Sequence, residues 1–143
     1  MAVYIRHKSK AEKGDTLTLR ISTKDKFALD LLATIQRKSL SSIVMEAIQK
    51  PLRDGLTMEI KGGRGKSPIY IPDVAYDPLI PDRLVKLAMV APDLLTEREK
   101  VVWKIVQEDS VFWTDNTPTL SKIRANWDSI QTETDKLLDS YSK

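Results

Sequence analysis

The 143-residue sequence contains no cysteine and one histidine, His7. Without cysteine the chain has no disulfide, no thiolate metal ligand and no thiol nucleophile. A lone histidine in a polar N-terminal stretch also removes most histidine-based catalysis and metal chemistry. We therefore expect a protein that is not an enzyme and that has no metal site and no cofactor.

Long apolar runs are also lacking. None approaches the roughly 20 residues that cross a membrane, and residues 1–13 lack the apolar core of a signal peptide. This pattern predicts a cytoplasmic protein with no membrane partner. Hydrophobic residues still make up 41% of the chain, enough for a folded core.

The charge is divided unevenly along the chain. Residues 1–66 contain 14 Lys/Arg against 7 Asp/Glu, whereas the remainder contains 9 against 13. A basic half joined to an acidic half indicates that only the first half faces a polyanion. Ordinary variation between protein surfaces is the alternative explanation.

The basic half begins with a predicted flexible basic arm, residues 1–15, followed by a strand. Residues 16–21, TLTLRI, alternate polar and apolar side chains, as in a strand with one buried face. Ser22 or Thr23 can then cap a helix over residues 24–37. The apolar stripe of this helix contains Phe27, Ala28, Leu31, Leu32 and Ile35.

A second helix is predicted after a short link at Lys38. Ser39 or Ser41 is its N-cap candidate, and Pro51 is expected to end or kink it. Its apolar face consists of Leu40, Ile43, Val44, Ala47 and Ile48.

Residues 55–81 are predicted to hold a small β-hairpin and a proline-rich linker. Alternation at residues 56–60 resumes at residues 69–71, on either side of a glycine-rich GGRG stretch. Four prolines in residues 67–81 then indicate an extended linker.

The region from residue 82 onward is predicted to be a helical C-terminal domain. A short helix covers residues 82–91, and the capping-box pattern Thr96–Glu99 begins a helix that runs to about Phe112. Thr117 and Pro118 suit the start of a last helix. Its apolar positions recur at heptad-like spacing: Leu120, Ile123, Trp127, Ile130, Thr134, Leu137 and Tyr141. Such a seam packs either against the preceding helix or against another subunit or protein.

One strand and two amphipathic helices within about 37 residues bury too little surface to fold alone. The single strand would also leave its backbone groups unpaired. Two copies solve both problems when their strands pair as an antiparallel ribbon and their helices interlock. Leu17, Leu19 and Ile21 then face a shared core, while Thr16, Thr18 and Arg20 face outward.

A two-stranded ribbon fits the major groove of B-DNA, where arginine and threonine side chains can reach base edges. Residues 16–22, TLTLRIS, followed by residues 39–44, SLSSIV, resemble the ribbon–helix–helix (Arc/MetJ/CopG-type) DNA-binding proteins. The resemblance covers about a quarter of the chain. It implies an intertwined homodimer whose base-reading residues are Thr16, Thr18 and Arg20. An ordinary solvated edge strand is the alternative.

The resemblance also implies that the start of the second helix, Ser39, Leu40 and Ser41, binds DNA phosphate. Free N–H groups at a helix N-terminus attract anions, which supports the same assignment. Lys24 and Lys38 are the cations predicted to contact phosphate beside them. Members of the family often have glycine in the link between the helices, whereas this chain has Arg37 and Lys38 there.

Further basic residues are weaker DNA-binding candidates. They are Arg6, Lys8, Lys10 and Lys13 in the arm, and Arg64 and Lys66 in the hairpin tip. Each group could equally be solvated. The tip does not fit a phosphate-binding P-loop, because Ile60 stands where that motif needs glycine.

Two remaining groups have structural explanations. The carboxylates Glu97, Glu99, Glu108 and Asp109 suit helix ends better than catalysis. The aromatic residues Trp103, Phe112, Trp113 and Trp127 suit a core better than a ligand cage.

The sequence thus predicts a mainly α protein: a ribbon–helix–helix domain in residues 16–54, then a hairpin and linker, then helices. Its expected function is sequence-specific binding to double-stranded DNA, bacterial nucleoid or plasmid, as a dimeric transcriptional repressor. The C-terminal helices could add higher assembly or a protein partner. The alternatives are an antitoxin-type repressor whose C-terminal half binds a partner protein, and an accessory protein of plasmid transfer or partition.

Overall fold

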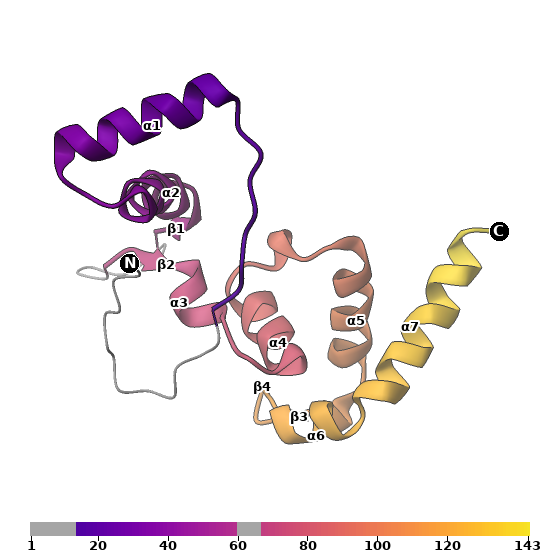
Figure 1. Cartoon of the computed structure of the whole chain (residues 1–143). Helices are drawn as coiled ribbons and strands as arrows, with labels where there is room; N and C mark the ends of the chain where they lie inside the picture. The colour runs from indigo at the N-terminus through magenta and orange to yellow at the C-terminus, as the bar shows by residue number, and fades with distance from the viewer. Residues whose placement is uncertain (1–13, 60–66) are drawn as a thin grey trace. The chain divides into compact units, whose positions relative to one another are not determined.

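The computed structural model describes residues 14–59 and 67–143 of the chain. The described part is mainly helical, with two small antiparallel strand pairs (Figure 1). It divides into two compact units, with the boundary between Gly55 and Leu56.

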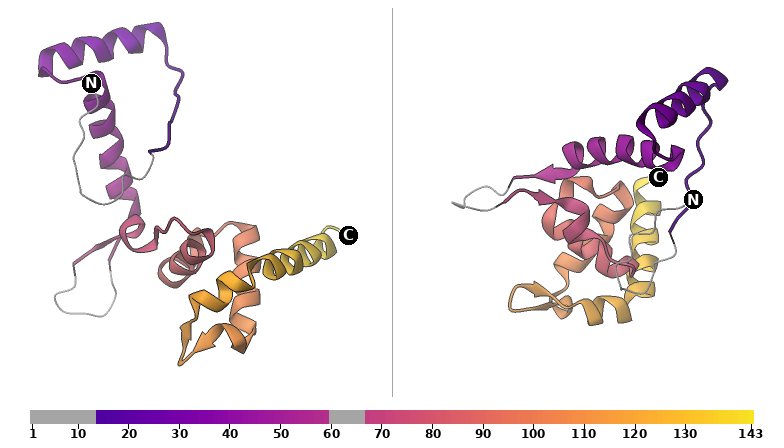
Figure 2. Two further views of the ribbon diagram at one scale, coloured as in Figure 1. Left: turned by 60° about the horizontal axis from the view of Figure 1, so that its bottom comes forward. Right: turned by 60° about the vertical axis from the view of Figure 1, so that its left-hand side comes forward.

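The first unit consists of an extended segment, residues 14–22, and two helices, α1 (Thr23–Gln36) and α2 (Leu40–Leu56). Ser22 begins α1, because its Oγ accepts a hydrogen bond from the backbone N–H of Asp25 at 3.0 Å. α2 runs across α1 rather than alongside it (Figures 1 and 2). The two helices therefore form an open corner.

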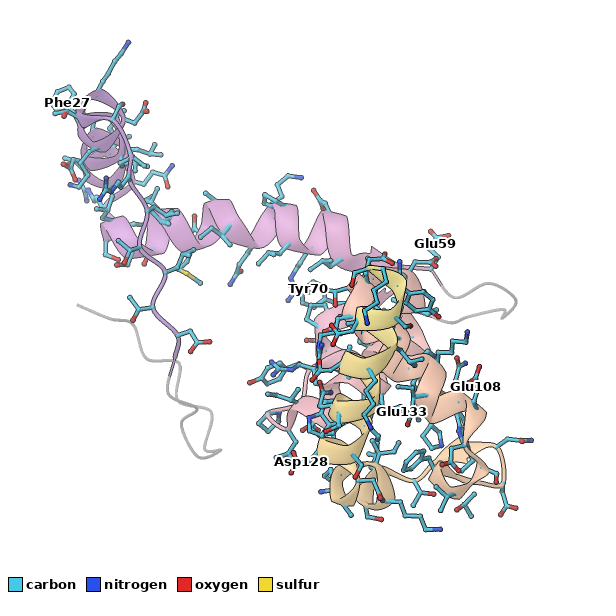
Figure 3. The ribbon with its side chains drawn as sticks, turned by 90° about the vertical axis from the view of Figure 1, so that its right-hand side faces the viewer. Phe27, Glu59, Tyr70, Glu108, Asp128 and Glu133 are labelled. Atoms are coloured by element: carbon cyan, nitrogen blue, oxygen red, sulfur yellow. The ribbon has the colours of Figure 1, made fainter. Side chains whose placement is uncertain are left out.

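This first unit has almost no core of its own. Ile43 is the one fully buried residue among its described residues. The apolar stripe of α1 lies in solvent, and Phe27, 63% exposed, projects from the helix (Figure 3). The other large apolar side chains exposed in this unit are Leu17, Leu19, Ile21, Leu31, Leu32, Ile35, Met45 and Leu52.

The turn between the two helices is closed by a residue in the left-handed conformation. Arg37 has φ 53° and ψ 42°, and the backbone N–H of Lys38 donates to the carbonyl of Ala33 at 3.0 Å. This arrangement is the Schellman motif, in which glycine is the usual residue. The turn therefore has the geometry of a Schellman motif although glycine is absent. The conformational strain of the left-handed backbone falls on Arg37.

Arg37→Gly is expected to stabilise the first unit by up to about 1.5 kcal/mol. Relief of the left-handed strain stabilises the folded state by about 1–2 kcal/mol. Glycine loses more backbone entropy on folding, which costs about 0.5–1 kcal/mol. Gln36→Gly is the matched control, because Gln36 is helical and glycine there should cost about 0.5–1 kcal/mol. Urea unfolding without DNA measures both. Equal destabilisation by the two substitutions would contradict the strain at Arg37.

The sequence predicted that Pro51 ends or kinks α2, and the structure contradicts the first of these alternatives. The helix continues to Leu56 with Pro51 inside it. Proline has no N–H, so one intrahelical hydrogen bond, to the carbonyl of Ala47, is lost. Pro51 and Ala47 are both exposed, so water can satisfy that carbonyl and the helix tolerates the proline.

The second unit begins with the predicted hairpin in shortened form. β1 (Thr57–Met58) pairs antiparallel with β2 (Ile69–Tyr70), with Thr57 opposite Tyr70. The predicted linker is not an extended segment: it contains β2 and α3 (Ile71–Ala75), which packs against the next helix. Pro72 lies in the first turn of α3, where its missing N–H costs no hydrogen bond, so its presence is compatible with a helix.

α4 (Ile80–Val90) and α5 (Glu97–Glu108) follow, joined through the short 3₁₀ turn η1 (Pro92–Leu94). The predicted capping box is confirmed: Thr96 Oγ1 accepts from the N–H of Glu99, and Glu99 Oε2 accepts from the N–H of Thr96. α5 ends earlier than predicted. Asp109 Oδ1 instead accepts from the N–H of Val111 and begins the 3₁₀ turn η2 (Ser110–Phe112).

A second hairpin occupies the region where the last helix was predicted to begin. β3 (Trp113–Thr114) pairs with β4 (Thr117–Pro118) around Asp115 and Asn116. Both turn residues have positive φ, 49° and 63°, as a two-residue type I′ hairpin turn requires. Thr117 is therefore a strand residue and not a helix cap.

The last predicted helix is two helices, α6 (Leu120–Ala125) and α7 (Trp127–Tyr141). They separate at Asn126, whose side-chain amide donates to the carbonyl of Lys122 at 2.8 Å. α7 packs against α5 in the same chain, and Arg98 of α5 contacts Asp135 and Gln131 of α7. Within the chain, the seam therefore packs against the preceding helix, and only Tyr141 at its end is largely exposed.

These helices enclose a single hydrophobic core. Trp103 and Trp113 lie against each other with ring centroids 5.9 Å apart, and Trp113 Nε1 donates to the carbonyl of Val106. The buried members are Leu84, Val85, Ala88, Leu95, Val102, Trp103, Ile105, Val106, Phe112, Ile123 and Ile130. The second unit therefore has the core that the first unit lacks.

Asp77 connects the segment before α4 to that helix. Its Oδ2 accepts from Lys86 Nζ at 2.6 Å and its Oδ1 from the N–H of Leu79 at 2.8 Å. The hydrogen bond from Lys86, and next the one from Leu79, hold the pKa of Asp77 below its ordinary value of 3.8. These hydrogen bonds stabilise the ionised form of the Asp77 carboxyl group in the folded state.

A lowered pKa in the folded state predicts a specific acid sensitivity. The stabilisation by Asp77 is fully present above about pH 4 and is lost as pH falls through the lower, folded-state pKa. The free energy of unfolding should therefore decline more steeply below that pH in the wild type than in Asp77→Asn. Urea titrations at a series of acidic pH values measure this difference, and parallel curves would contradict it.

Candidate nucleic-acid interface

The base-reading candidates lie in the extended segment before α1. Thr16, Thr18 and Arg20 are exposed, and neither of the two strand pairs includes their segment. The predicted strand is thus extended but has no paired strand among the described residues. Arg20 has no ion-pair partner among the described residues, so its guanidinium is available to a ligand.

The alternate side chains of this segment are equally open. Leu17, Leu19 and Ile21 are 74%, 61% and 48% exposed. Burial in water-free surroundings is worth roughly 1.5–3 kcal/mol for each such side chain. A segment with one face of exposed leucine and isoleucine and another of threonine and arginine is therefore ready to pair with an apolar surface.

The start of α2 is capped as predicted. Ser39 Oγ accepts from the backbone N–H of Ser42 at 3.1 Å, and the hydroxyl groups of Ser39 and Ser42 lie 2.9 Å apart. Leu40 and Ser41 occupy the first turn, where backbone N–H groups have no partner inside the helix. Two donors and the positive end of the helix dipole are thus directed at the same place.

The cations near these helix starts differ in availability. Lys24, at the start of α1, forms no ion pair among the described residues, whereas Lys38 Nζ lies 2.7 Å from Glu46 Oε1. The sequence-based assignment overlooked this pair. Because both partners are about half exposed, the pair contributes only about 0–1 kcal/mol, and a phosphate could displace Glu46.

Arg37 is a further cation that the sequence-based assignment did not include. It is exposed, lies two residues before the Ser39 cap, and makes no side-chain ion pair in the described part of the chain. The sequence feature that could have identified Arg37 is a basic residue in the turn directly before a helix N-terminus. Arg37 therefore joins Lys24 as a free cation at the helix starts of the first unit.

The weaker DNA-binding candidates are the basic residues of the arm and of the hairpin tip. Arg6, Lys8, Lys10 and Lys13, and the tip residues Arg64 and Lys66, lie outside the described residues. The candidate interface is accordingly built from residues 16–41 alone.

Residues 14–59 and 67–143 contain no group of three or more metal-ligating side chains and no helix long and apolar enough to span a membrane. Glu97 pairs with Lys100, and Glu99 and Asp109 serve as caps. Glu108 lies 3.9 Å from Lys104, so all four carboxylates have structural neighbours.

Comparison with known proteins finds no matching family model, no similar curated protein and no similar solved structure. The functional conclusion therefore depends on the chain's own residues.

Proposed function

We propose that the protein is a homodimeric, sequence-specific DNA-binding protein of the ribbon–helix–helix type. Residues 16–22 of two copies would pair as an antiparallel ribbon and enter the major groove. Thr16, Thr18 and Arg20 would contact base edges, while the α2 start at Ser39, Leu40 and Ser41 would bind phosphate, with Lys24 and Lys38 beside it.

The observation that carries this proposal is the exposed apolar surface of the first unit. Leu17, Leu19 and Ile21 continue onto the α1 stripe of Phe27, Leu31, Leu32 and Ile35, and all are at least 38% exposed. With Ile43 as the one buried residue in the described part of this unit, the unit lacks a core sufficient for stability. A second copy supplies the same surface, and a two-fold axis lets each surface cover the other.

The polar face of the ribbon carries the specificity. Arginine can bind guanine O6 and N7 with two hydrogen bonds, and threonine can combine a hydroxyl contact with a methyl contact to thymine. Two-fold symmetry repeats each contact in both half-sites. The positive balance of residues 1–66 favours approach to DNA.

Transcriptional repression is the regulatory role we propose for this binding, with bacterial nucleoid or plasmid DNA as the location. An antitoxin whose tail folds on its partner fits less well, because the second unit already has its own core of buried side chains around Val102, Val106 and Ile123. The folded second unit is free to serve assembly or regulation.

Selection from a random duplex library tests the proposal. The full-length wild type is expected to enrich a short site with two-fold symmetry, bound by two chains. The salt dependence of binding should be steep, since released counterions accompany each phosphate contact. Enrichment of no sequence, or binding by a single chain, would overturn the proposal.

A further inference from the structure

A hollow lined with both cations and apolar side chains lies in the second unit. It has a volume of about 600 Å³ and is bordered by α4, α5 and α7, within the size range of small-molecule sites in proteins. Leu84 and Val102 of the core form part of its wall, with the half-buried Leu87 and Trp127 beside them. Ile80, 60% exposed, is an apolar member of the lining that reaches solvent.

The polar groups of the lining are mostly hydrogen-bond donors. Arg83 has no ion pair in the described part of the chain, and its guanidinium lies 5.7 Å from the ring centre of Tyr76. Arg98 is held by Asp135 Oδ1 at 2.7 Å and by Gln131 Oε1 at 2.8 Å. Because Gln131 uses its oxygen in this contact, its amide N–H groups are left to donate to something else.

Glu99 is the one carboxylate in the lining. Its Oε2 accepts from the N–H of Thr96 at 2.7 Å, in the first turn of α5. There the positive end of the helix dipole offsets its charge. The lining thus combines apolar side chains and amide donors with Arg83, a cation that has no ion pair among the described residues, while its one anion is engaged in capping.

We propose that this hollow binds a small amphipathic carboxylate. The apolar part of the ligand would lie against Leu87 and Trp127, and its carboxylate would accept charge-assisted hydrogen bonds from Arg83. The carboxylate could belong to an arylalkanoic acid or to a linear alkanoic acid. Binding at this site does not depend on the proposed DNA-binding function, because the hollow lies wholly within the second unit.

Isothermal titration of the full chain, without DNA, tests the site with two pairs of probes. 3-Phenylpropionate is compared with 3-phenylpropionamide, and octanoate with octanamide. The acid of at least one pair is expected to bind about tenfold or more tighter than its amide, as for one hydrogen bond to a charged group. The pair that shows the preference identifies the aryl or the linear class.

Two substitutions locate the binding. Arg83→Gln should bring the affinity for the acid to that for the amide, whereas Lys122→Gln, which removes an exposed cation that does not line the hollow, should change nothing. Ile80 is the first residue of α4, where an acidic residue suits the helix dipole. Ile80→Asp should therefore preserve the fold and should weaken binding of the acid probe more than Ile80→Asn does.

Three results would overturn the proposal: no binding of any probe, equal affinity for acid and amide, or an acid preference that survives in Arg83→Gln. Sedimentation of the same samples examines one further explanation. If Ile80→Asp lowers the mass of the assembly, the hollow is covered by a second copy and the proposed ligand site is wrong.

Discussion

Arg20→Ala is expected to remove the preference of the protein for its selected DNA site. A bidentate arginine–guanine contact contributes about 1–3 kcal/mol of base discrimination, and the proposed dimer makes two of them. Affinity for the selected site should fall by about 30-fold or more, while weak binding to random DNA persists. Competition binding to the selected and a scrambled duplex measures both affinities.

Lys24→Ala is the matched control for this experiment. Lys24 is an exposed cation without an ion pair in the described part of the chain, placed by the proposal at the phosphate backbone. Its removal should weaken binding to both duplexes by similar factors and reduce the salt dependence. If Arg20→Ala behaves like Lys24→Ala, or selects the wild-type site unchanged, the extended segment does not read bases.

Ile35→Asp is expected to convert the proposed dimer into a monomer. Ile35 is 77% exposed in the single chain, so a carboxylate there meets water and costs little within one subunit. In the proposed dimer the same carboxylate would be buried without a partner, at a cost of several kcal/mol. Light scattering coupled to size exclusion should show a halved mass, with DNA binding lost in parallel.

Gln36→Asp separates this effect from the introduction of charge alone. Gln36 is the next residue of α1, is also exposed, and lies off the apolar stripe. It places the new carboxylate in the same last turn, so any cost from the helix dipole is matched. The control should remain dimeric. A dimeric Ile35→Asp would show that α1 does not form the interface.

The starts of α1, α2 and α5 are well encoded in the sequence. Ser22, Ser39 and Thr96 each act as caps where short polar side chains precede an apolar period, because a side-chain oxygen satisfies an N–H that the helix cannot. The periodicity of α1 also located its exposed stripe. Periodicity does not supply the surface that would cover this stripe in the proposed dimer, since that surface would belong to a second copy.

The region of β3 and β4 shows why local patterns can be ambiguous. Thr117 and Pro118 fit both a helix start and a strand. The deciding signal was the preceding Asp115–Asn116 pair, because these two residue types tolerate the positive φ of a type I′ turn. At Asn126 a side-chain hydrogen bond to the carbonyl of Lys122 accompanies a break between two helices. The heptad pattern of the sequence nevertheless continues across this break.

In the candidate interface, the sequence identified the alternating segment and the Ser39 cap but not the competition for Lys38. The ion pair with Glu46 joins residues eight positions apart across a helix start, which no simple spacing rule predicts. Arg37 was overlooked as a candidate DNA-contacting residue, because at that position of the turn the sequence analysis noted only that glycine was absent. Its left-handed backbone leaves it exposed beside the α2 start.

The unequal distribution of buried side chains gives the two units different dependence on protein concentration. The second unit closes its core within one chain, so its folding is unimolecular. The first unit, paired as proposed, would complete its core only when two chains meet, and its folded fraction would follow mass action. Dilution would then dissociate and unfold the proposed DNA-reading unit while leaving the C-terminal unit folded. The DNA-binding activity would therefore rise more steeply than the protein concentration.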